Sequence, residues 1–297
     1  MHIMVALVVA VTTFLGAIFH APQRVITPQA RVLFGGDMMF DRWIRTVAQK
    51  NGGDYLFACL DPLLAQEDMV VGNLEGPITG NPSVSLGTGP GDEFNMIFTF
   101  PPSTAKLLYK HNIRMVSIGN NHIENFGESG VSTTIAALRD ARVGSFGNPL
   151  QEKVATTSIH GVSLALINYN EFAVLDASTT VSQIKRARAG GELPIVYAHW
   201  GEEYRAATER EKYLAHVFVD EGAEAVIGSH PHVVQEHELY RGKHIYYSLG
   251  NLIFDQYWND AVSHGLLVEL TLTSQGVQSV REIIVELERD GRTCPIS

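Results

Sequence analysis

The sequence predicts a layered α/β domain, and three observations lead to this fold class. Short apolar runs typical of buried strands recur along the chain. Segments with helical spacing alternate with these runs, and the last third of the chain is richer in strand-like segments. The chain has 297 residues, of which 45% are hydrophobic, and this is sufficient for a complete core.

The expected elements follow from these patterns. Strands are predicted at Val32–Phe34, Met69–Val71, Met115–Ile118, Ile195–Tyr197, Ala225–Ile227, Ile245–Leu249, Gly265–Leu272 and Val280–Leu287. Helices are predicted at Asp41–Lys50, Tyr55–Gln66, Ser103–His111, Gly130–Ala141, Thr179–Arg188 and Glu209–Glu221. The last helix has the clearest start, because Thr208 and Glu211 form a capping-box pattern.

Charge excludes one class of partner. The formal net charge is −10 and the pI is near 5.6, whereas a surface that binds nucleic acid would be basic. We therefore expect no nucleic-acid partner. An anionic substrate would need a local cation in this acidic protein, either an arginine or a metal ion.

The two cysteines, Cys59 and Cys294, form no metal-binding spacing. We expect two unpaired thiols, because nothing in their spacing indicates a bond. A single disulfide between them is the alternative.

The N-terminus differs from the rest of the chain. Ile3 to Phe19 is a run of 17 residues without a charge, which is short for a membrane span and long for a signal-peptide core. It predicts an N-terminal hydrophobic helix that anchors the protein, with the globular part outside the cytoplasm. A secreted form, cleaved near Ala21, is the alternative. We thus divide the chain into an anchor or signal at 1–20, a proline-containing tether at 21–30 and one domain at 31–290.

Five polar clusters directly follow the first five predicted strands. They are Gly35-Gly36-Asp37, Gly72-Asn73-Leu74-Glu75, Gly119-Asn120-Asn121-His122, Ala198-His199-Trp200-Gly201 and Gly228-Ser229-His230-Pro231-His232. An open α/β sheet binds ligands at the carboxyl ends of its strands, so we expect these side chains to converge at one edge. Carboxylate, amide and imidazole groups together suit a hard or borderline divalent metal.

Each cluster also has a structural interpretation. Asp37 could cap the helix predicted to begin near Asp41, Glu75 could cap the loop that follows it, and His199 could be a satisfied core histidine. For Asp37, the preceding glycines favour a tight turn and a close approach of the backbone. Convergence on a metal site is the reading we adopt, because five such clusters occur in equivalent positions.

The motif His230-Pro231-His232 is the sharpest local signal. In an extended segment the two imidazoles would point to opposite sides, but a turn at Pro231 can direct both toward one centre. A polar surface loop is the alternative. The most loop-like segment, Gly76–Glu93, follows Glu75 directly and is rich in glycine and proline. We expect it to overhang the site.

The chain resembles the poly-γ-glutamate capsule-biosynthesis protein family of the CapA type over about residues 31–270. The segments that carry the resemblance are Gly36-Asp37-Met38-Met39 with Arg42, Asn73-Leu74-Glu75-Gly76-Pro77, Asn120-Asn121-His122 with Gly127, His199-Trp200-Gly201-Glu202-Glu203-Tyr204, Gly228-Ser229-His230-Pro231-His232-Val233 with Gln235, and Tyr247-Ser248-Leu249-Gly250-Asn251 with Phe254-Asp255. The resemblance implies a four-layer αββα sandwich of the calcineurin-like metallophosphoesterase type.

The resemblance also implies roles for individual residues. One or two divalent ions (Mn, Zn, Mg or Fe) would be held by a ligand set that comprises Asp37, Glu75, Asn121, His199, His230 and His232. Its catalytic residues would be His122 as proton donor, Asp37, and Arg42, which would orient an anionic substrate. Further substrate-binding residues are predicted to be Asn120, Glu203, Tyr204 and Asn251.

Two positions depart from the expected patterns. Met39 stands where phosphoesterases place a ligand histidine, and a thioether is a poor ligand for a hard dication. Asn125 stands where the capsule family has an aspartate three residues after His122, with Glu124 as a partial substitute. Met39 bears on the number of ions that the site holds, and Asn125 bears on the orientation of His122.

Three functions compete at this stage. The first is a metal-dependent, phosphoesterase-like hydrolase at the cell envelope that acts on an anionic polymer or a small anionic substrate. The second is a non-catalytic polymer-binding or export component of a membrane-bound polyglutamate synthase complex. The third is a metal-independent acid/base enzyme of the epimerase type.

Overall fold

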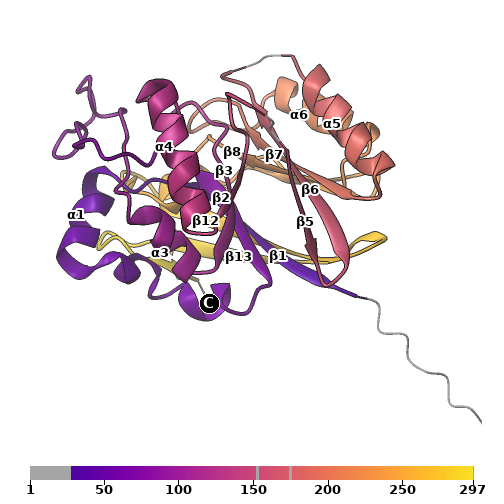
Figure 1. Cartoon of the computed structure of the whole chain (residues 1–297), viewed down its shortest axis with the longest axis horizontal. Helices are drawn as coiled ribbons and strands as arrows, with labels where there is room; N and C mark the ends of the chain where they lie inside the picture. Colours follow the sequence, from indigo (N-terminus) through magenta and orange to yellow (C-terminus); the bar gives the residue numbers. More distant parts are fainter. Residues whose placement is uncertain (1–27, 152–153, 174–175, 297) are drawn as a thin grey trace, which may run out of the picture.

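The computed structural model describes residues 28–151, 154–173 and 176–296. Two mixed sheets pack face to face, and each is covered by helices on its outer side (Figure 1). The predicted N-terminal helix and anchor lie outside the described residues. Within the described ranges, no helix is long and apolar enough to cross a membrane.

The first sheet has eight strands in the order β14-β13-β12-β1-β2-β3-β4, and β11 pairs with the end of β1. Strands β1 to β4 and β11 are parallel, whereas β12, β13 and β14 extend the sheet in antiparallel fashion. Their bounds are β1 Ala30–Met38, β2 Met69–Leu74, β3 Ile113–Ser117, β4 Gly144–Phe146, β11 Asn251–Ile253, β12 His264–Thr273, β13 Gly276–Leu287 and β14 Thr293–Pro295.

The second sheet has six strands in the order β5-β6-β7-β8-β10-β9. The four inner strands are parallel and the two edge strands, β5 and β9, are antiparallel. Their bounds are β5 Val154–Ile159, β6 Val162–Asn170, β7 Leu193–His199, β8 Ala225–Ser229, β9 His237–Tyr240 and β10 Lys243–Tyr246.

Helices form the two outer layers (Figure 1). Those on the first sheet are α1 Arg42–Asn51, the 3-10 helix η1 Gly53–Phe57, α2 Asp61–Leu64, α3 Thr104–Lys110 and α4 Gly127–Asp140. Those on the second sheet are α5 Ser178–Ala189 and α6 Glu209–Asp220, while the short 3-10 helix η2 Ala261–Ser263 precedes β12.

Side chains alternate between the two faces of each strand, so each sheet contributes to one core between the sheets and to another beneath its helices. On β1, Val32 and Phe34 pack between the sheets, while Leu33 packs against the helices. On β7, Ile195 packs between the sheets and Val196 packs against α5 and α6. Successive strand residues point to opposite faces, so consecutive apolar residues on each strand fill both layers. The predicted four-layer αββα sandwich is confirmed.

Two predicted elements are wrong in detail. The helix expected at Tyr55–Gln66 is split into η1 and α2, because Pro62 belongs to the first turn of α2 and lacks the N–H that a helix interior needs. The strand expected at Ile245–Leu249 ends at Tyr246, and the chain then crosses to the first sheet to form β11. The capping box of α6 is confirmed, with both the Thr208 and Glu211 bonds present.

The expectation of two unpaired thiols is also wrong. Cys59 and Cys294 form a disulfide across a sequence separation of 235 residues, with their Cα atoms 4.9 Å apart. The bond joins the segment between η1 and α2 to the edge strand β14. Sequence spacing could not reveal it, because the fold alone brings these two segments together.

Candidate metal centre

The carboxyl ends of strands from both sheets meet in one place. Asp37 lies near the end of β1, and Glu75 follows the last residue of β2. His199 ends β7, and the His230-Pro231-His232 turn follows β8. The side chains of all five acidic and imidazole residues are buried. The predicted convergence on one site is therefore confirmed.

Glu75 lies at the centre of this cluster. Its Oε1 atom is 3.6 Å from His232 Nε2 and 4.0 Å from His199 Nε2. There are two sets of three ligand atoms, and within each set the atoms lie no more than 4.8 Å from one another. One set comes from Glu75, His199 and His230, and the other comes from Asp37, Glu75 and His232. Both sets contain Glu75, one of the six ligands that the resemblance implied.

The unpaired atoms of the cluster fit a bound cation. Glu75 Oε1, His122 Nε2, His230 Nδ1 and His232 Nε2 are buried without a hydrogen-bond partner among the described residues. An unsatisfied buried polar group costs about 1–3 kcal/mol, and a cation bound by these four atoms would offset that cost. Oxygen and imidazole donors together suit Zn, Mn, Fe or Mg.

The pKa shifts of the carboxylates also favour a cation. Burial alone would raise the pKa of Asp37, but hydrogen bonding and charge from His232, together with His199 and Asn73, lower it to about 2. Burial, reinforced by the negative charge of Asp37, raises the pKa of Glu75 well above its usual range. Two buried carboxylates thus repel each other, and a dication between them would offset that cost.

The imidazoles are kept in the neutral form that binds metals. Burial lowers the pKa of His122 to about 4 and that of His230 to about 3. Burial also lowers the pKa of His199 well below its usual value. Since only a neutral imidazole has a free lone pair, these shifts leave ligand atoms available near pH 7.

The His-Pro-His turn reaches the centre through unusual backbone angles. His230 and His232 have φ values of 98° and 56°, which non-glycine residues rarely adopt and which concentrate at functional sites. The turn is tied down because the His230 N–H donates to Asp37 Oδ2 at 3.1 Å. On β1, a Cβ at Gly36 would lie 1.9 Å from the Gly250 carbonyl oxygen, so only glycine permits this close approach.

Asn121 faces His199 as a second ligand would. His199 Nε2 lies 2.9 Å from Asn121 Oδ1. The opposite ring nitrogen, Nδ1, lies 3.0 Å from Ser229 Oγ and 3.4 Å from Asn73 Nδ2. An imidazole nitrogen and an amide oxygen are both donor types that bind divalent ions. The ligand roles of Asn121 and the other five residues stay a prediction.

Amide side chains orient the ligands, and two of them were expected to bind substrate. Asn251 Oδ1 accepts from His232 Nδ1 at 2.9 Å, and its Nδ2 donates to Gln256 and to two carbonyls. Asn120 donates to Asn73 and to the Leu74 carbonyl. Both are buried with their amide groups engaged. Their predicted role in substrate binding stays a prediction.

Asn73 contributes to the site, although it is not among the predicted ligands, catalytic residues or substrate-binding residues. Its Nδ2 donates to Asp37 Oδ1 at 2.8 Å and approaches Glu75 Oε2 at 3.4 Å. Its position in the same polar cluster as Glu75 was the available signal. By joining two carboxylates, Asn73 reduces their mutual repulsion and holds them in place.

The two departures have clear structural outcomes. Met39 packs in the core between the first sheet and its helices, where its sulfur accepts from the Asp41 N–H at 2.9 Å. Asn125 Oδ1 lies 3.3 Å from His122 Nδ1 and also accepts from the Phe98 N–H. A neutral oxygen therefore orients His122 in place of a carboxylate, while Glu124 is exposed.

The remaining predicted residues line a groove of about 790 Å³ beside the cluster. Arg42, Glu203 and Tyr204 contribute to its walls, and Thr88–Asp92 from the predicted overhanging loop form part of its rim. Arg42 is not free, since its guanidinium contacts both carboxylate oxygens of Asp255 and Asn95 Oδ1. Its role toward an anionic substrate stays a prediction.

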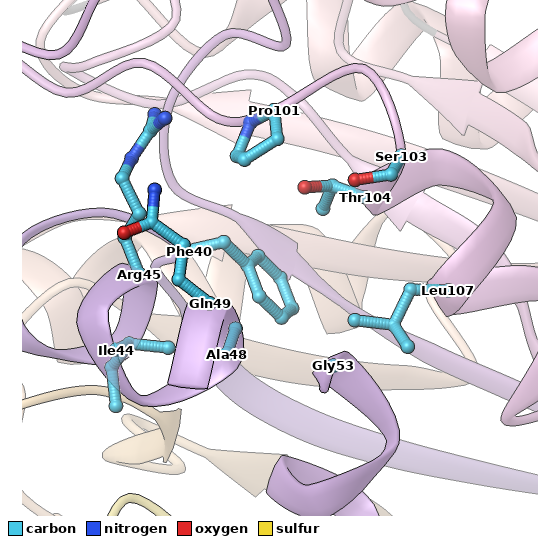
Figure 2. Close-up of a pocket in the computed structure, with 10 residues that line it drawn as sticks. All are labelled: Phe40, Ile44, Arg45, Ala48, Gln49, Gly53, Pro101, Ser103, Thr104 and Leu107. Atoms are coloured by element: carbon cyan, nitrogen blue, oxygen red, sulfur yellow. The ribbon is translucent and has the colours of Figure 1, made fainter. Parts of the chain in front are cut away.

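A second cavity, of about 350 Å³, lies between α1, η1 and α3 (Figure 2). Phe40, Ile44 and Leu107 supply much of its apolar lining. Its only charged lining residue, Arg45, pairs with Asp41. Since the lining contains no carboxylate, histidine or cysteine among the described residues, this cavity is not the catalytic candidate.

The fold has a known counterpart. A phosphatase from Mycoplasma pneumoniae of known crystal structure superposes with a TM-score of 0.55 and 12% identity, covering 88% of this chain and 95% of that chain. The comparison, together with the four layers, defines a metallophosphoesterase-like fold.

The family is defined by sequence. The model of the family described as "Bacterial capsule synthesis protein PGA_cap" matches residues 31–256, and the chain belongs to this family. The PGA biosynthesis protein CapA of Bacillus subtilis is 28% identical over 76% of this chain and 63% of its own length. The capsule biosynthesis protein CapA of Bacillus anthracis is 28% identical over 88% of this chain and 68% of its own length. The chain thus spans about two thirds of the length of these relatives.

Proposed function

We propose that this protein is a metal-dependent hydrolase of the phosphoesterase type that acts in the synthesis of a capsule polymer. The observation that carries the proposal is the position of Glu75, which belongs to both sets of buried ligand atoms and whose Oε1 atom has no hydrogen-bond partner among the described residues. The process is inferred from the names of the relatives, which refer to capsule and PGA biosynthesis.

The metal centre would consist of six residues from both sheets and the turns that follow them. They are Asp37, Glu75, Asn121, His199, His230 and His232. A divalent ion bound there supplies Lewis-acid chemistry, because it polarises the scissile group and activates water. One or two ions are compatible with the two sets of ligand atoms that share Glu75. Met39 offers no further ligand, since it packs in the helix-side core.

His122 would exchange a proton with the leaving group. Its Nε2 atom has no partner among the described residues and lies 4.0 Å from Glu75 Oε1, so it faces the centre. Asn125 contacts its Nδ1 atom, and the Phe98 ring packs against it with centroids 4.4 Å apart. The imidazole is therefore held through Nδ1 and its ring face, and Nε2 stays available for general acid or base chemistry.

We propose that the domain works on the extracytoplasmic side of the membrane and is held there by the N-terminal segment. Support comes from the Cys59–Cys294 disulfide, because such bonds persist in oxidising compartments and are rare in the cytosol. A secreted form without the anchor would place the domain in the same oxidising environment.

The test combines elemental analysis with activity. The full chain, purified in mild detergent, should retain at least one divalent ion and cleave a member of a phosphoester panel, with γ-glutamyl peptides as a second panel. His232→Ala should lose both properties. His216→Ala is the matched control, since His216 pairs with Glu238 away from the site. A protein that binds no Mn, Zn, Mg or Fe at saturation would refute the proposal.

A second candidate is a non-catalytic component of a polymer synthase complex in the membrane. It is favoured by a further relative, a probable polyglutamine synthesis accessory protein of Mycobacterium tuberculosis that is 23% identical over 63% of this chain. Co-isolation with a membrane synthase that persists in His122→Ala, combined with no turnover by the wild-type protein, would support this candidate instead.

A further inference from the structure

The groove beside the metal centre has two exposed aromatic walls. Tyr204 and Trp258 are 39% and 55% exposed, and both line the groove. Their ring centroids are 5.4 Å apart and their planes meet at 82°. Two aromatic rings at right angles form adjacent sides of a box whose faces are rich in negative potential.

The charged side chains that line the groove are mostly acidic, so they add to the negative potential of the ring faces. Its charged lining residues are Arg42, Asp92, Glu203 and Asp255. Arg42 is matched by Asp255 through two contacts. No lysine and no second arginine line the groove among the described residues. Asp92 and Glu203 therefore leave an unmatched negative charge beside the aromatic rings.

Tyr204 is held rigidly and is connected to the metal centre. Its N–H donates to the Pro231 carbonyl at 2.8 Å, and its hydroxyl accepts from Gln256 at 3.1 Å. Gln256 in turn accepts from Asn251, which accepts from His232 Nδ1. The rings of Tyr204 and His232 are 6.1 Å apart. A group that contacts Tyr204 therefore lies close to the metal centre.

The carboxylate of Glu203 lies against Tyr204. Burial raises the pKa of the Tyr204 hydroxyl, and the negative charge of Glu203 raises it further. The same charge also contributes to the raised pKa of Glu75. A further carboxylate from a ligand would meet repulsion at this position. An ammonium group would be attracted by both Glu203 and the aromatic faces.

We propose that this groove recognises an ammonium group on the substrate whose reacting end occupies the metal centre. The identity of the reacting end rests on the function proposed above, whereas ammonium binding rests only on the groove. Side chains of a polyanion such as polyglutamate are repelled from this part of the site. The groove therefore selects a compact ligand with an anionic end and a cationic end.

Ammonium binding can be measured without turnover. Choline and ethanolamine represent quaternary and primary ammonium groups, and 3,3-dimethyl-1-butanol is a neutral analogue of choline. Calorimetric titration of the full chain should detect binding of one of the two amines and weaker binding of the neutral alcohol. Trp258→Ala and Glu203→Gln should weaken amine binding by about tenfold. Tyr213→Ala is the control, because Tyr213 is 66% exposed on α6.

A second measurement separates this inference from the proposed function. In the Mn-loaded protein, kcat/KM for phosphocholine or phosphoethanolamine should exceed that for glycerol phosphate, and Trp258→Ala should bring the ratio toward one. Amine binding without any ester cleavage would refute the hydrolase and leave the inference standing. Ester cleavage without preference for an amine, or amine binding equal in wild type and Trp258→Ala, would overturn the inference.

Discussion

Glu75 Oε1 lies 3.6 Å from His232 Nε2, and neither atom has a hydrogen-bond partner in the described part of the chain. His232 directs its other nitrogen to Asn251, so its Nε2 atom and the carboxylate oxygen face each other, each without a partner. Such an arrangement is unfavourable unless a cation lies between the two atoms. This contact is the basis of the first prediction.

Glu75→Gln should abolish stoichiometric metal binding, because both sets of ligand atoms contain Glu75. In metal-free protein the same change should raise the free energy of unfolding by at least about 1 kcal/mol, since it removes a carboxyl group whose ionised form is disfavoured by burial and by the charge of Asp37. Elemental analysis and thermal melting with and without metal measure both effects. Metal content equal to wild type in this variant would contradict the assignment. Glu238→Gln, at the partly exposed partner of His216, is the control.

Asn251→Ala should weaken metal affinity by about 10–100-fold, the usual effect of removing a group that orients a ligand histidine. Asn251 holds the tautomer of His232 through a contact of 2.9 Å. Calorimetric titration with Zn or Mn measures the change. Asn259→Ala, outside the cluster, should bind metal as wild type does. Equal affinities for wild type and Asn251→Ala would show that His232 needs no such support.

Met39→His should not create a new ligand, although phosphoesterases place a histidine there. Met39 is fully buried in the helix-side core, and an imidazole without partners in that core costs about 1–3 kcal/mol. Denaturant unfolding should show this loss, with a smaller one for Met39→Leu. An increase in bound metal per chain in Met39→His would mean that this side chain reaches the centre.

Loss of the disulfide should destabilise the domain by about 2–5 kcal/mol, because the bond closes a very long loop. The test is thermal melting of the double variant Cys59→Ser with Cys294→Ser, compared with wild type. A reductant should lower the melting temperature of the wild type and leave the double variant unchanged. Identical melting of both proteins under oxidising conditions would exclude a structural role.

Glu224 should make stability depend on pH. Burial alone would raise its pKa, but hydrogen bonds from Lys243, Arg188 and the Val277 N–H lower it below the usual 4.5. Its stabilisation is therefore present above the unfolded pKa of about 4.3 and is lost as the pH falls through the folded value. Glu224→Gln should cost about 1–3 kcal/mol at pH 7. The difference from wild type should disappear at strongly acidic pH, and a constant difference would contradict this account.

Much of the candidate site was predictable because each cluster follows a recognisable buried strand. Asp37, Glu75 and His199 were expected to converge, since parallel strands deliver their carboxyl ends to one edge. The substrate-binding roles predicted for Asn120 and Asn251 stay predictions, and the structure shows the amide groups of both residues bonded to neighbouring protein groups. Whether an amide side chain faces a ligand or supports a histidine depends on its rotamer and on its neighbours in space. A sequence motif specifies neither of these.

Local sequence by itself determined the αβ alternation, the capping box of α6 and the polar residues at the strand ends. These features depend on side-chain period and on contacts within a few residues, which are written in the order of the chain. Only the tertiary structure decided the Cys59–Cys294 bond, the inward packing of Met39 and the right-angled pair of Tyr204 and Trp258. Each of these depends on segments distant in sequence that meet because two sheets bury their faces against each other.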